Sequence, residues 1–276
     1  MRSPLLRISI LVGCLAAALA ACEKQAPATT DAPSAAAEDV AAGAGEVPDY
    51  RAIAEAAVAD QKRPAADRAD DERRKPVEAL TFFEIAPGIT VFEIEAGAGW
   101  YTELLSHAVG ASGNVVMQNP QGFLSFVGDK IAERLKDGRL ANVRQSISLF
   151  DALDAPDGSV DLVTWVQGPH ELYYKPDSGP LGDPAKSYAE IYRILKPGGA
   201  FVVIDHSAES GSPETTGNDV HRIDKVIVMQ MADQAGFQLV AESDFLANPE
   251  DPLTASVFDP SIRGHTDQFA LRFRKE

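Results

Sequence analysis

Cysteine and basic residues are both scarce in this chain of 276 residues. It has 2 cysteines, and Cys14 lies in an apolar N-terminal run, so the body of the protein has no disulfide and no cysteine metal site. The 25 Lys and Arg are outnumbered by 41 Asp and Glu, which gives a formal charge of −16. This acidic balance disfavours nucleic acid or anionic lipid as an electrostatic partner. The hydrophobic fraction, 45%, is enough for one globular domain with a full core.

The N-terminal apolar run is too short to cross a bilayer. It extends from Ile8 to Leu19, follows Arg2 and Arg7, and ends in Ala-Ala-Cys at Cys22, which is typical of a secretory signal. Leu-Ala-Ala-Cys resembles the bacterial lipoprotein signal, in which the cysteine is acylated. The resemblance implies a signal peptide with a lipobox over residues 1–22, lipidation of Cys22, and export to the periplasmic side of a bacterial membrane. The alternative is an ordinary signal peptide.

Residues 23–48 are rich in Ala, Pro, Thr, Asp and Gly without apolar periodicity, which predicts a disordered tether. The lipid on Cys22 would then be the chain's only contact with the membrane, and the tether would connect it to the folded domain. Residues 49–276 then form one domain, with a helical extension over 49–84 and a core over 85–276. The extension contains an alanine-rich helix, Tyr50–Asp60, and a charged stretch, 63–76, that begins a helix ending near Phe83.

The core alternates apolar strands with helical patterns, which is typical of a parallel sheet covered on both faces. The predicted strands are Ile89–Glu93, Asn114–Gln118, Val143–Ile147, Val160–Val166, Ala200–Asp205, Gln238–Ser243 and Gln268–Arg274; the predicted helices are Gly99–Val109, Phe123–Leu135, Ala185–Leu195 and Val220–Ala235. No helix separates the last two strands, so we expect one of them to run antiparallel at the sheet edge. The fold class is therefore α/β, a doubly wound and mostly parallel seven-stranded sheet.

The stretch from Val91 to Thr102 leads from a strand through a glycine turn directly into a helix. Such a turn brings backbone N–H groups and a helix N-terminus close to any ligand at the sheet edge. Gly97 and Gly99 would let the backbone approach that ligand. Glu93 would project at the carboxyl end of the strand, where a buried carboxylate is costly unless it has a partner.

This stretch resembles the first motif of class I S-adenosylmethionine-dependent methyltransferases. Three further motifs resemble that superfamily in the right order: Asp157–Trp165 before and within the fourth strand, the Leu-Lys-Pro-Gly-Gly turn at 195–199, and Ala-Gly-Phe at 235–237. A narrower resemblance, over nearly the whole mature domain, is to a bacterial family of secreted or lipoprotein predicted methyltransferases. It is carried by residues 63–76, 99–103, 205–206, 221–224 and 263–269. The resemblance implies a Rossmann-like methyltransferase fold and S-adenosylmethionine as cofactor.

The resemblance also implies which residues meet the cofactor: Glu93, Gly97, Gly99, Trp100, Tyr101, Gln118, Asn119, Asp151 and Gln167. Two positions depart from the superfamily pattern. Glu95 stands where the first glycine is expected, and Gln118 or Asn119 stands where a carboxylate usually accepts both ribose hydroxyls. An amide still bonds a hydroxyl, but without charge assistance. Trp100 and Tyr101 are equally compatible with a place in the core, and Asp151 with a solvated loop.

Histidines and carboxylates gather at the predicted carboxyl ends of the fourth and fifth strands. His170 and Glu171 would form a base with its orienting carboxylate, and His206 lies on the same rim. Such clusters also suit a metal, but no ligand pair at i, i+4 spacing is present, so no metal ligand is predicted.

The predicted function is S-adenosylmethionine-dependent methyl transfer to an unidentified small acceptor. Two alternatives remain. One is a methyltransferase-fold pseudo-enzyme or ligand-binding lipoprotein of the cell envelope, favoured by Glu95 and by the amides of the second strand. The other is a hydrolase or metal-assisted enzyme that uses the histidine rim. Fold alone does not choose between them.

Overall fold

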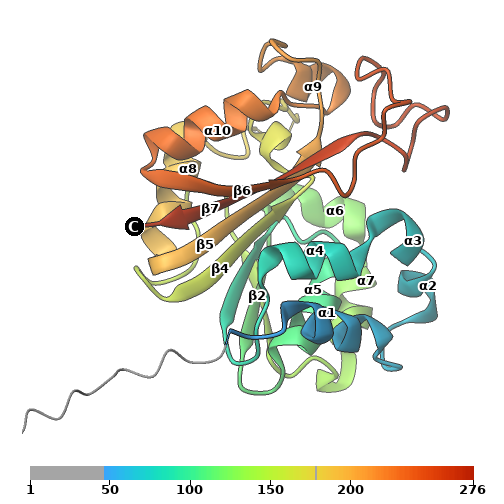
Figure 1. The fold of residues 1–276 in the computed structure, drawn as a ribbon, viewed down its shortest axis with the longest axis vertical. Coiled ribbons are helices and arrows are strands. Elements are labelled where there is room, and N and C mark those ends of the chain that lie inside the picture. Colours follow the sequence, from blue (N-terminus) through green and yellow to red (C-terminus); the bar gives the residue numbers. More distant parts are fainter. Residues whose placement is uncertain (1–46, 178) are drawn as a thin grey trace, which may run out of the picture. The chain divides into compact units, whose positions relative to one another are not determined.

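A computed structural model of the chain describes residues 47–177 and 179–276. The predicted signal peptide, Cys22 and nearly all of the predicted tether lie outside these residues. The described strands form one seven-stranded sheet in the order β3-β2-β1-β4-β5-β7-β6 (Figure 1). They are β1 (Thr90–Ile94), β2 (Asn114–Asn119), β3 (Val143–Ile147), β4 (Val160–Val166), β5 (Leu195–His206), β6 (Phe237–Ser243) and β7 (Gln268–Lys275). The predicted fold class is confirmed.

One detail of the predicted sheet is wrong. Strand β7 is antiparallel to both of its neighbours, but it lies between β5 and β6 and not at the edge. Three consecutive apolar residues of β7, Phe269 to Leu271, are buried, which requires cover on both faces of the sheet. Strand β6 alternates between buried or half-buried and exposed residues, and it forms the edge.

The helices differ from prediction mainly where one long helix was expected. They are α1 (Tyr50–Ala59), α2 (Ala65–Arg68), α3 (Asp71–Arg74), α4 (Pro76–Phe83), α5 (Trp100–Val109), α6 (Leu124–Val127), α7 (Lys130–Leu135), α8 (Pro184–Ile194), α9 (Thr216–Val220) and α10 (Lys225–Gln234), with short 3₁₀ turns at Gln121–Phe123, Lys136–Gly138 and Pro169–Leu172. None of the helices within the described ranges is long and apolar enough to span a bilayer.

Each unexpected break has a local cause. Lys75 adopts a left-handed conformation (φ 46°) and Pro76 follows it, so the charged stretch becomes short helices. Gly128 (φ 54°) separates α6 from α7 inside the predicted helix 123–135. Asp224 caps α10 by accepting a hydrogen bond from the backbone N–H of Val226, and His221 (φ 54°) ends α9.

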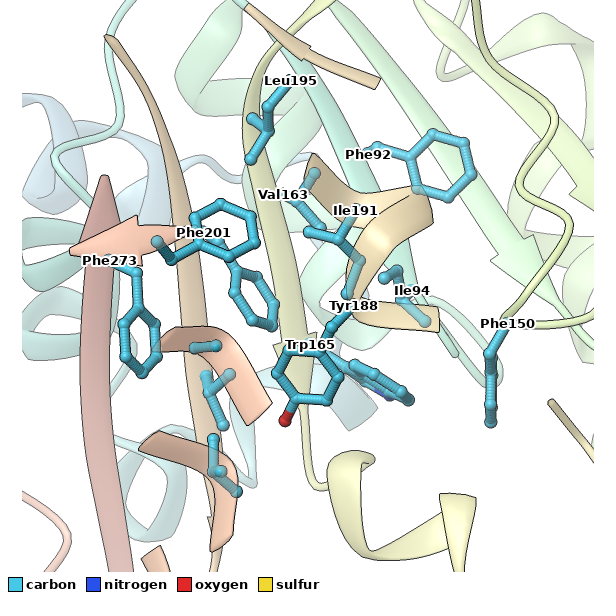
Figure 2. Close-up of a cluster of buried hydrophobic side chains, with 14 of the residues drawn as sticks. Phe92, Ile94, Phe150, Val163, Trp165, Tyr188, Ile191, Leu195, Phe201 and Phe273 are labelled. Atoms are coloured by element: carbon cyan, nitrogen blue, oxygen red, sulfur yellow. The ribbon is translucent and has the colours of Figure 1, made fainter. Parts of the chain in front are cut away.

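Two apolar cores cover the two faces of the sheet, as the placement of the helices shows (Figure 1). Helices α8 and α10 pack on one face, where Trp165, Tyr188 and Phe201 belong to a cluster of buried aromatic and aliphatic side chains (Figure 2). Helices α1, α4 and α5 cover the other face, around residues such as Leu80 and Leu104. Several buried polar side chains, Gln118, Asn119 and Asp205 among them, lie at the carboxyl ends of the strands.

Candidate functional site

The chain turns between β1 and α5 through a loop, Glu95 to Gly99, that uses the left-handed region repeatedly. Its φ angles are 55° at Glu95, 57° at Gly97 and 85° at Gly99. Glycine adopts such angles without strain, whereas a glutamate does so at a cost. Glu95 therefore follows the backbone path of the expected glycine, but it adds a side chain at the end of β1.

The two amides at the end of β2 brace this loop. Gln118 Oε1 accepts a hydrogen bond from the backbone N–H of Glu95 (2.9 Å), and Gln118 Nε2 donates to the carbonyl of Ser148 (2.7 Å). Asn119 bonds both backbone groups of Gly97, at 2.8 and 3.1 Å. Both side chains are fully buried. These contacts give Gln118 and Asn119 a bracing role, and their contact with a ribose stays a prediction.

Arg134 holds the loop from the other side. Its Nε donates to the carbonyl of Ala98 (2.5 Å), and its Nη1 pairs with Asp67 (2.7 Å) and Glu103 (2.9 Å). Arg139 pairs with both oxygens of Glu103 at 2.6 Å. The N-terminal extension, the loop and α5 are thus joined by one ionic network.

Glu93 is buried next to this loop and has one side-chain hydrogen bond. Thr102 Oγ1 donates to its Oε2 at 2.5 Å. Burial raises the pKa of Glu93 to about 8, because the hydroxyl of Thr102 and the charge of Arg134 offset only part of the desolvation. The group is therefore largely protonated at neutral pH, and a cation brought beside it would favour its ionisation.

A pocket of about 240 Å³ opens at the carboxyl ends of β1 and β4. Among the predicted site residues, Glu93, Gly97, Trp100, Tyr101 and Gln167 line it, together with Glu95 and Arg74. Gly99 forms the turn behind it, and its missing Cβ is faced by Arg134 Cδ and Met117 Cε at 2.6 and 2.9 Å.

Arg74 is the pocket residue that the sequence did not single out. Its guanidinium lies 4.7 Å from the centre of the Trp100 ring, a cation–π distance. Its Nε is buried without a hydrogen-bond partner among the described residues, the nearest carboxylate being that of Asp70 at 3.7 Å. Burial lowers the pKa of Arg74, and the residue remains a cation. In the sequence, Arg74 is marked only by its place in the charged stretch 63–76. A stretch of that pattern is equally typical of a solvent-exposed helix.

The side chain of Glu95 links the glycine loop to strand β4. Trp165 Nε1 donates to Glu95 Oε2 at 3.2 Å. Burial and the nearby charge of Glu171 raise the pKa of Glu95 well above its ordinary value. A buried carboxyl side chain therefore occupies the position at which the superfamily pattern has only hydrogen.

His170 and Glu171 lie in contact in the loop after β4, and His170 has a further partner from β5; their role as base and orienting carboxylate stays a prediction. His170 Nδ1 lies 2.7 Å from Asp205 Oδ1, and its Nε2 lies 3.3 Å from Glu171 Oε1. Burial alone would lower the pKa of His170, yet the charges of Asp205 and Glu171 outweigh it and raise this pKa to about 10. Burial likewise opposes ionisation of Glu171, but hydrogen bonds from His170 and His221 lower its pKa to about 2.

His206 lies near His170, with ring centres 5.9 Å apart, and behaves differently. Its Nδ1 is 2.7 Å from Thr266 Oγ1. Burial lowers the pKa of His206 to about 3 despite the opposing effect of Asp205, and the positive charge of His170 contributes to the shift. His206 is therefore the neutral imidazole of the rim at pH 7, and His170 the cationic one.

Asp151 does not reach the pocket. Its carboxylate accepts a hydrogen bond from the backbone N–H of Asp183 (3.0 Å), just before α8. The predicted contact of Asp151 with the cofactor is not supported by these contacts.

Sequence comparisons relate the chain to known methyltransferases. Residues 78–216, half of the chain, match the ubiE/COQ5 methyltransferase family. A ubiquinone/menaquinone biosynthesis C-methyltransferase UbiE from Hydrogenovibrio crunogenus is 30% identical over 169 residues, 60% of this chain and 62% of that protein. The protein of the same name from a Marinomonas species is 30% identical over 190 residues, 68% of this chain and 64% of that protein. The chain thus spans slightly less than two thirds of each relative.

Structural comparison supports the same fold. A crystal structure of a SAM dependent methyltransferase from Aquifex aeolicus matches with a TM-score of 0.54 and 21% identity, over 78% of this chain and 99% of that one. The cofactor predicted from the sequence, S-adenosylmethionine, is that of the family. These matches do not include the narrower family of secreted or lipoprotein methyltransferases, so membership of that family stays a prediction. The chain belongs to the ubiE/COQ5 family of S-adenosylmethionine-dependent methyltransferases.

Proposed function

We propose that this chain binds S-adenosylmethionine in the Glu93 pocket and transfers its methyl group to a small acceptor. The observation that carries the proposal is the pairing of one carboxyl, Glu93, with one guanidinium, Arg74, among the residues that line the pocket. The amino-acid part of the cofactor carries an ammonium and a carboxylate. The pocket therefore offers a carboxyl that a neighbouring ammonium would ionise, and a cation for the carboxylate.

In the protein without a ligand, both Glu93 and Arg74 lack interactions that a ligand could supply. Glu93 keeps its proton because burial is only partly compensated, and the Arg74 Nε has no hydrogen-bond partner among the described residues. An ammonium beside Glu93 and a carboxylate beside Arg74 would relieve both deficits. Gly97 supports the same site, because a Cβ built there meets no protein atom within 4 Å.

Bound S-adenosylmethionine supplies an electrophilic methyl group on a sulfonium. The protein's contribution is then mainly to hold the acceptor in line with that group. Where the acceptor must lose a proton, His206 is the better base of the two buried histidines, because its pKa of about 3 keeps it neutral. His170, with a pKa of about 10, has no free site for a proton at pH 7.

Calorimetric titration with S-adenosylmethionine and S-adenosylhomocysteine tests the proposal directly. Glu93→Gln keeps the acceptor for the Thr102 hydroxyl but removes the ionisable group, and we expect at least tenfold weaker binding. Arg74→Gln should weaken binding similarly, whereas the control Arg73→Gln should bind as the wild type does, because Arg73 does not line the pocket. Wild-type protein that binds neither ligand at millimolar concentration would refute the proposal.

A second candidate function is ligand binding without methyl transfer, and Glu95 is the observation that favours it. Its side chain lines the pocket at the position where the motif has glycine. Glu95→Gly restores the family pattern and separates the two candidates. If Glu95 obstructs the cofactor, the variant should bind S-adenosylmethionine at least tenfold more tightly than the wild type. Equal affinities would show that the cofactor site tolerates Glu95, which favours the enzyme.

For the acceptor we propose a small molecule and not a nucleic acid, because the chain carries a formal charge of −16. The relatives are named for ubiquinone and menaquinone biosynthesis. Quinone precursors are accordingly the first acceptors to assay with labelled S-adenosylmethionine. Absence of label transfer to them, with cofactor binding intact, would exclude that acceptor class.

For location we propose an exported lipoprotein with its lipid on Cys22, facing the periplasm. The support is the sequence alone: a charged start, a short apolar run and Leu-Ala-Ala-Cys. Incorporation of a radiolabelled fatty acid in a bacterial host tests it. The wild type should take up label and fractionate with membranes, and Cys22→Ser should do neither. Equal labelling of the two would refute acylation at Cys22.

A further inference from the structure

Three side chains that can ligate a metal converge beside the loop after β4. His170 Nε2 and His221 Nδ1 each lie 3.3 Å from Glu171 Oε1. The ligand atoms of the three residues all lie within 4.8 Å of one another. Two imidazole nitrogens and one carboxylate oxygen are a donor set that suits zinc and neighbouring first-row divalent ions.

The separations suit a tetrahedral ion. An ion bound at about 2.0–2.1 Å from each donor places its ligands roughly 3.3–3.5 Å from one another. The two separations of 3.3 Å already match this span. The third, at most 4.8 Å, requires a shift of about 1 Å, and His221 is the most exposed of the three side chains.

Asp205 orients His170 in the way that a carboxylate bonded to the other ring nitrogen orients a metal-binding imidazole. Its Oδ1 lies 2.7 Å from His170 Nδ1, and its Oδ2 accepts from the backbone N–H of His170 at 2.9 Å. The backbone N–H of His206 also donates to Asp205, at 2.8 Å. Because Nδ1–H points to Asp205, Nε2 of His170 is the nitrogen directed at Glu171 and His221, and a metal ion bound there would displace the Nε2 proton.

One buried atom of the cluster lacks a partner. Glu171 Oε2 makes no hydrogen bond with any residue of the described ranges, although it is shielded from solvent. A buried carboxylate with an unpartnered oxygen is costly, and the charge of a cation bound at the neighbouring Oε1 would offset part of that cost. The His221 ring is held nearby by Tyr174 and Phe258, whose ring centres lie 5.0 and 4.8 Å away.

From these contacts we infer that His170, Glu171 and His221 bind one divalent transition-metal ion of the zinc type. The fourth coordination position is left for water or for an oxygen of a small molecule. The sequence did not predict the site because two ligands are adjacent residues and the third follows 50 positions later. The inference stands on the cluster alone and does not depend on methyl transfer.

The competing arrangement is an ion-pair network that binds no metal, with a protonated His170 between Asp205 and Glu171. Calorimetric titration with Zn²⁺ at pH 7.5 distinguishes the two, with untagged full-length protein that has been stripped by a chelator. We expect one equivalent bound at micromolar or lower dissociation constant. Co²⁺ in place of Zn²⁺ should give the visible absorption bands of a tetrahedral site.

His221→Asn is the decisive variant, because asparagine tolerates the left-handed conformation at this position (φ 54°) and is a poor zinc ligand. We expect at least tenfold weaker Zn²⁺ binding and loss of the Co²⁺ bands, with an unchanged circular dichroism spectrum. His265→Ala, which removes an exposed histidine outside the cluster, should bind as the wild type does. Equal affinity of the wild type and His221→Asn, or no saturable binding by the wild type, would overturn the inference.

Discussion

Glu93 and Glu103 are two buried glutamates, ten positions apart, with opposite electrostatic surroundings. Glu93 has a single hydroxyl donor, and burial raises its pKa to about 8. Burial opposes ionisation of Glu103 as well, but His107, Arg139 and Arg134 donate to it and lower its pKa to about 2. In Glu103 the protein itself supplies the charges and donors that stabilise the ionised carboxylate. In Glu93 they are largely absent, and a bound cation would supply the missing charge. Burial alone therefore does not identify a ligand-binding carboxyl. A buried carboxyl that has no cationic partner in the protein is the better indication.

The largest expected effect is on stability, at Glu103. Glu103→Ala removes the carboxylate that Arg134 and Arg139 share and leaves these cations underpaired at a partly buried position. We expect a loss of about 3 kcal/mol in the free energy of unfolding, measured by urea denaturation. The control is Asp154→Ala, which breaks an exposed pair with Arg144 and should cost less than about 1 kcal/mol. Equal losses in the two variants would mean that the Glu103 network stabilises the fold no more than an exposed ion pair does.

The second prediction concerns the pH dependence of stability at Glu93. Because its folded pKa, about 8, exceeds its ordinary value of 4.5, the folded state holds one proton more than the unfolded state between these pH values. The stability of the wild type therefore falls as pH rises through that window, and Glu93→Gln lacks this loss. We expect the two proteins to be equally stable at pH 5 and the variant to be more stable by roughly 2.5 kcal/mol at pH 7, with a larger difference at pH 9.

Parallel denaturation curves of the wild type and Glu93→Gln at pH 5, 7 and 9 check this. A constant difference across the series would contradict the raised pKa. The control is Glu103→Gln, whose difference from the wild type should instead diminish as pH falls from 4.5 toward 2, because that carboxylate stabilises the fold only while it is ionised.

The order of strands and the glycine loop were predictable because their signals are local. Apolar periodicity located six of the seven strands to within one residue at each end. Strand β5 begins at Leu195, five residues before its predicted start, so that it includes the predicted turn at 195–199. Gly97 and Gly99 occupy left-handed angles that few other residues adopt. The interior place of β7 was predictable in principle from the apolar run Phe269–Leu271. It was missed because chain order suggested an edge.

The site was predicted less completely because its chemistry depends on partners distant in the sequence. Asp205, which fixes the charge of His170, lies 35 positions away. Arg74 reaches the pocket from the N-terminal extension, and its charged neighbours give no sign of which one points inward. Gln118 and Asn119 resemble ligand contacts in the sequence, yet their amides bond the loop backbone. The roles of these residues depend on contacts that only the folded structure brings together.

The smallest expected effect distinguishes the two glycines of the loop. At Gly97 a Cβ meets no protein atom within 4 Å, so Gly97→Ala should cost only the strain of a left-handed alanine, about 1 kcal/mol. At Gly99 a Cβ would lie 2.6 Å from Arg134 Cδ and 2.9 Å from Met117 Cε, so Gly99→Ala adds displacement of both side chains. We expect Gly99→Ala to be the less stable variant by urea denaturation.

Binding should rank the same two variants in the opposite order. The Cβ of Gly97→Ala would project into the space that the Glu93 pocket offers to the cofactor, whereas that of Gly99→Ala is directed at protein atoms behind the turn. Measured on folded protein, S-adenosylmethionine affinity should therefore fall further in Gly97→Ala than in Gly99→Ala. If both stability and affinity were lower in the same variant, the loop would act as one structural unit, and the division between its pocket side and its packing side would be wrong.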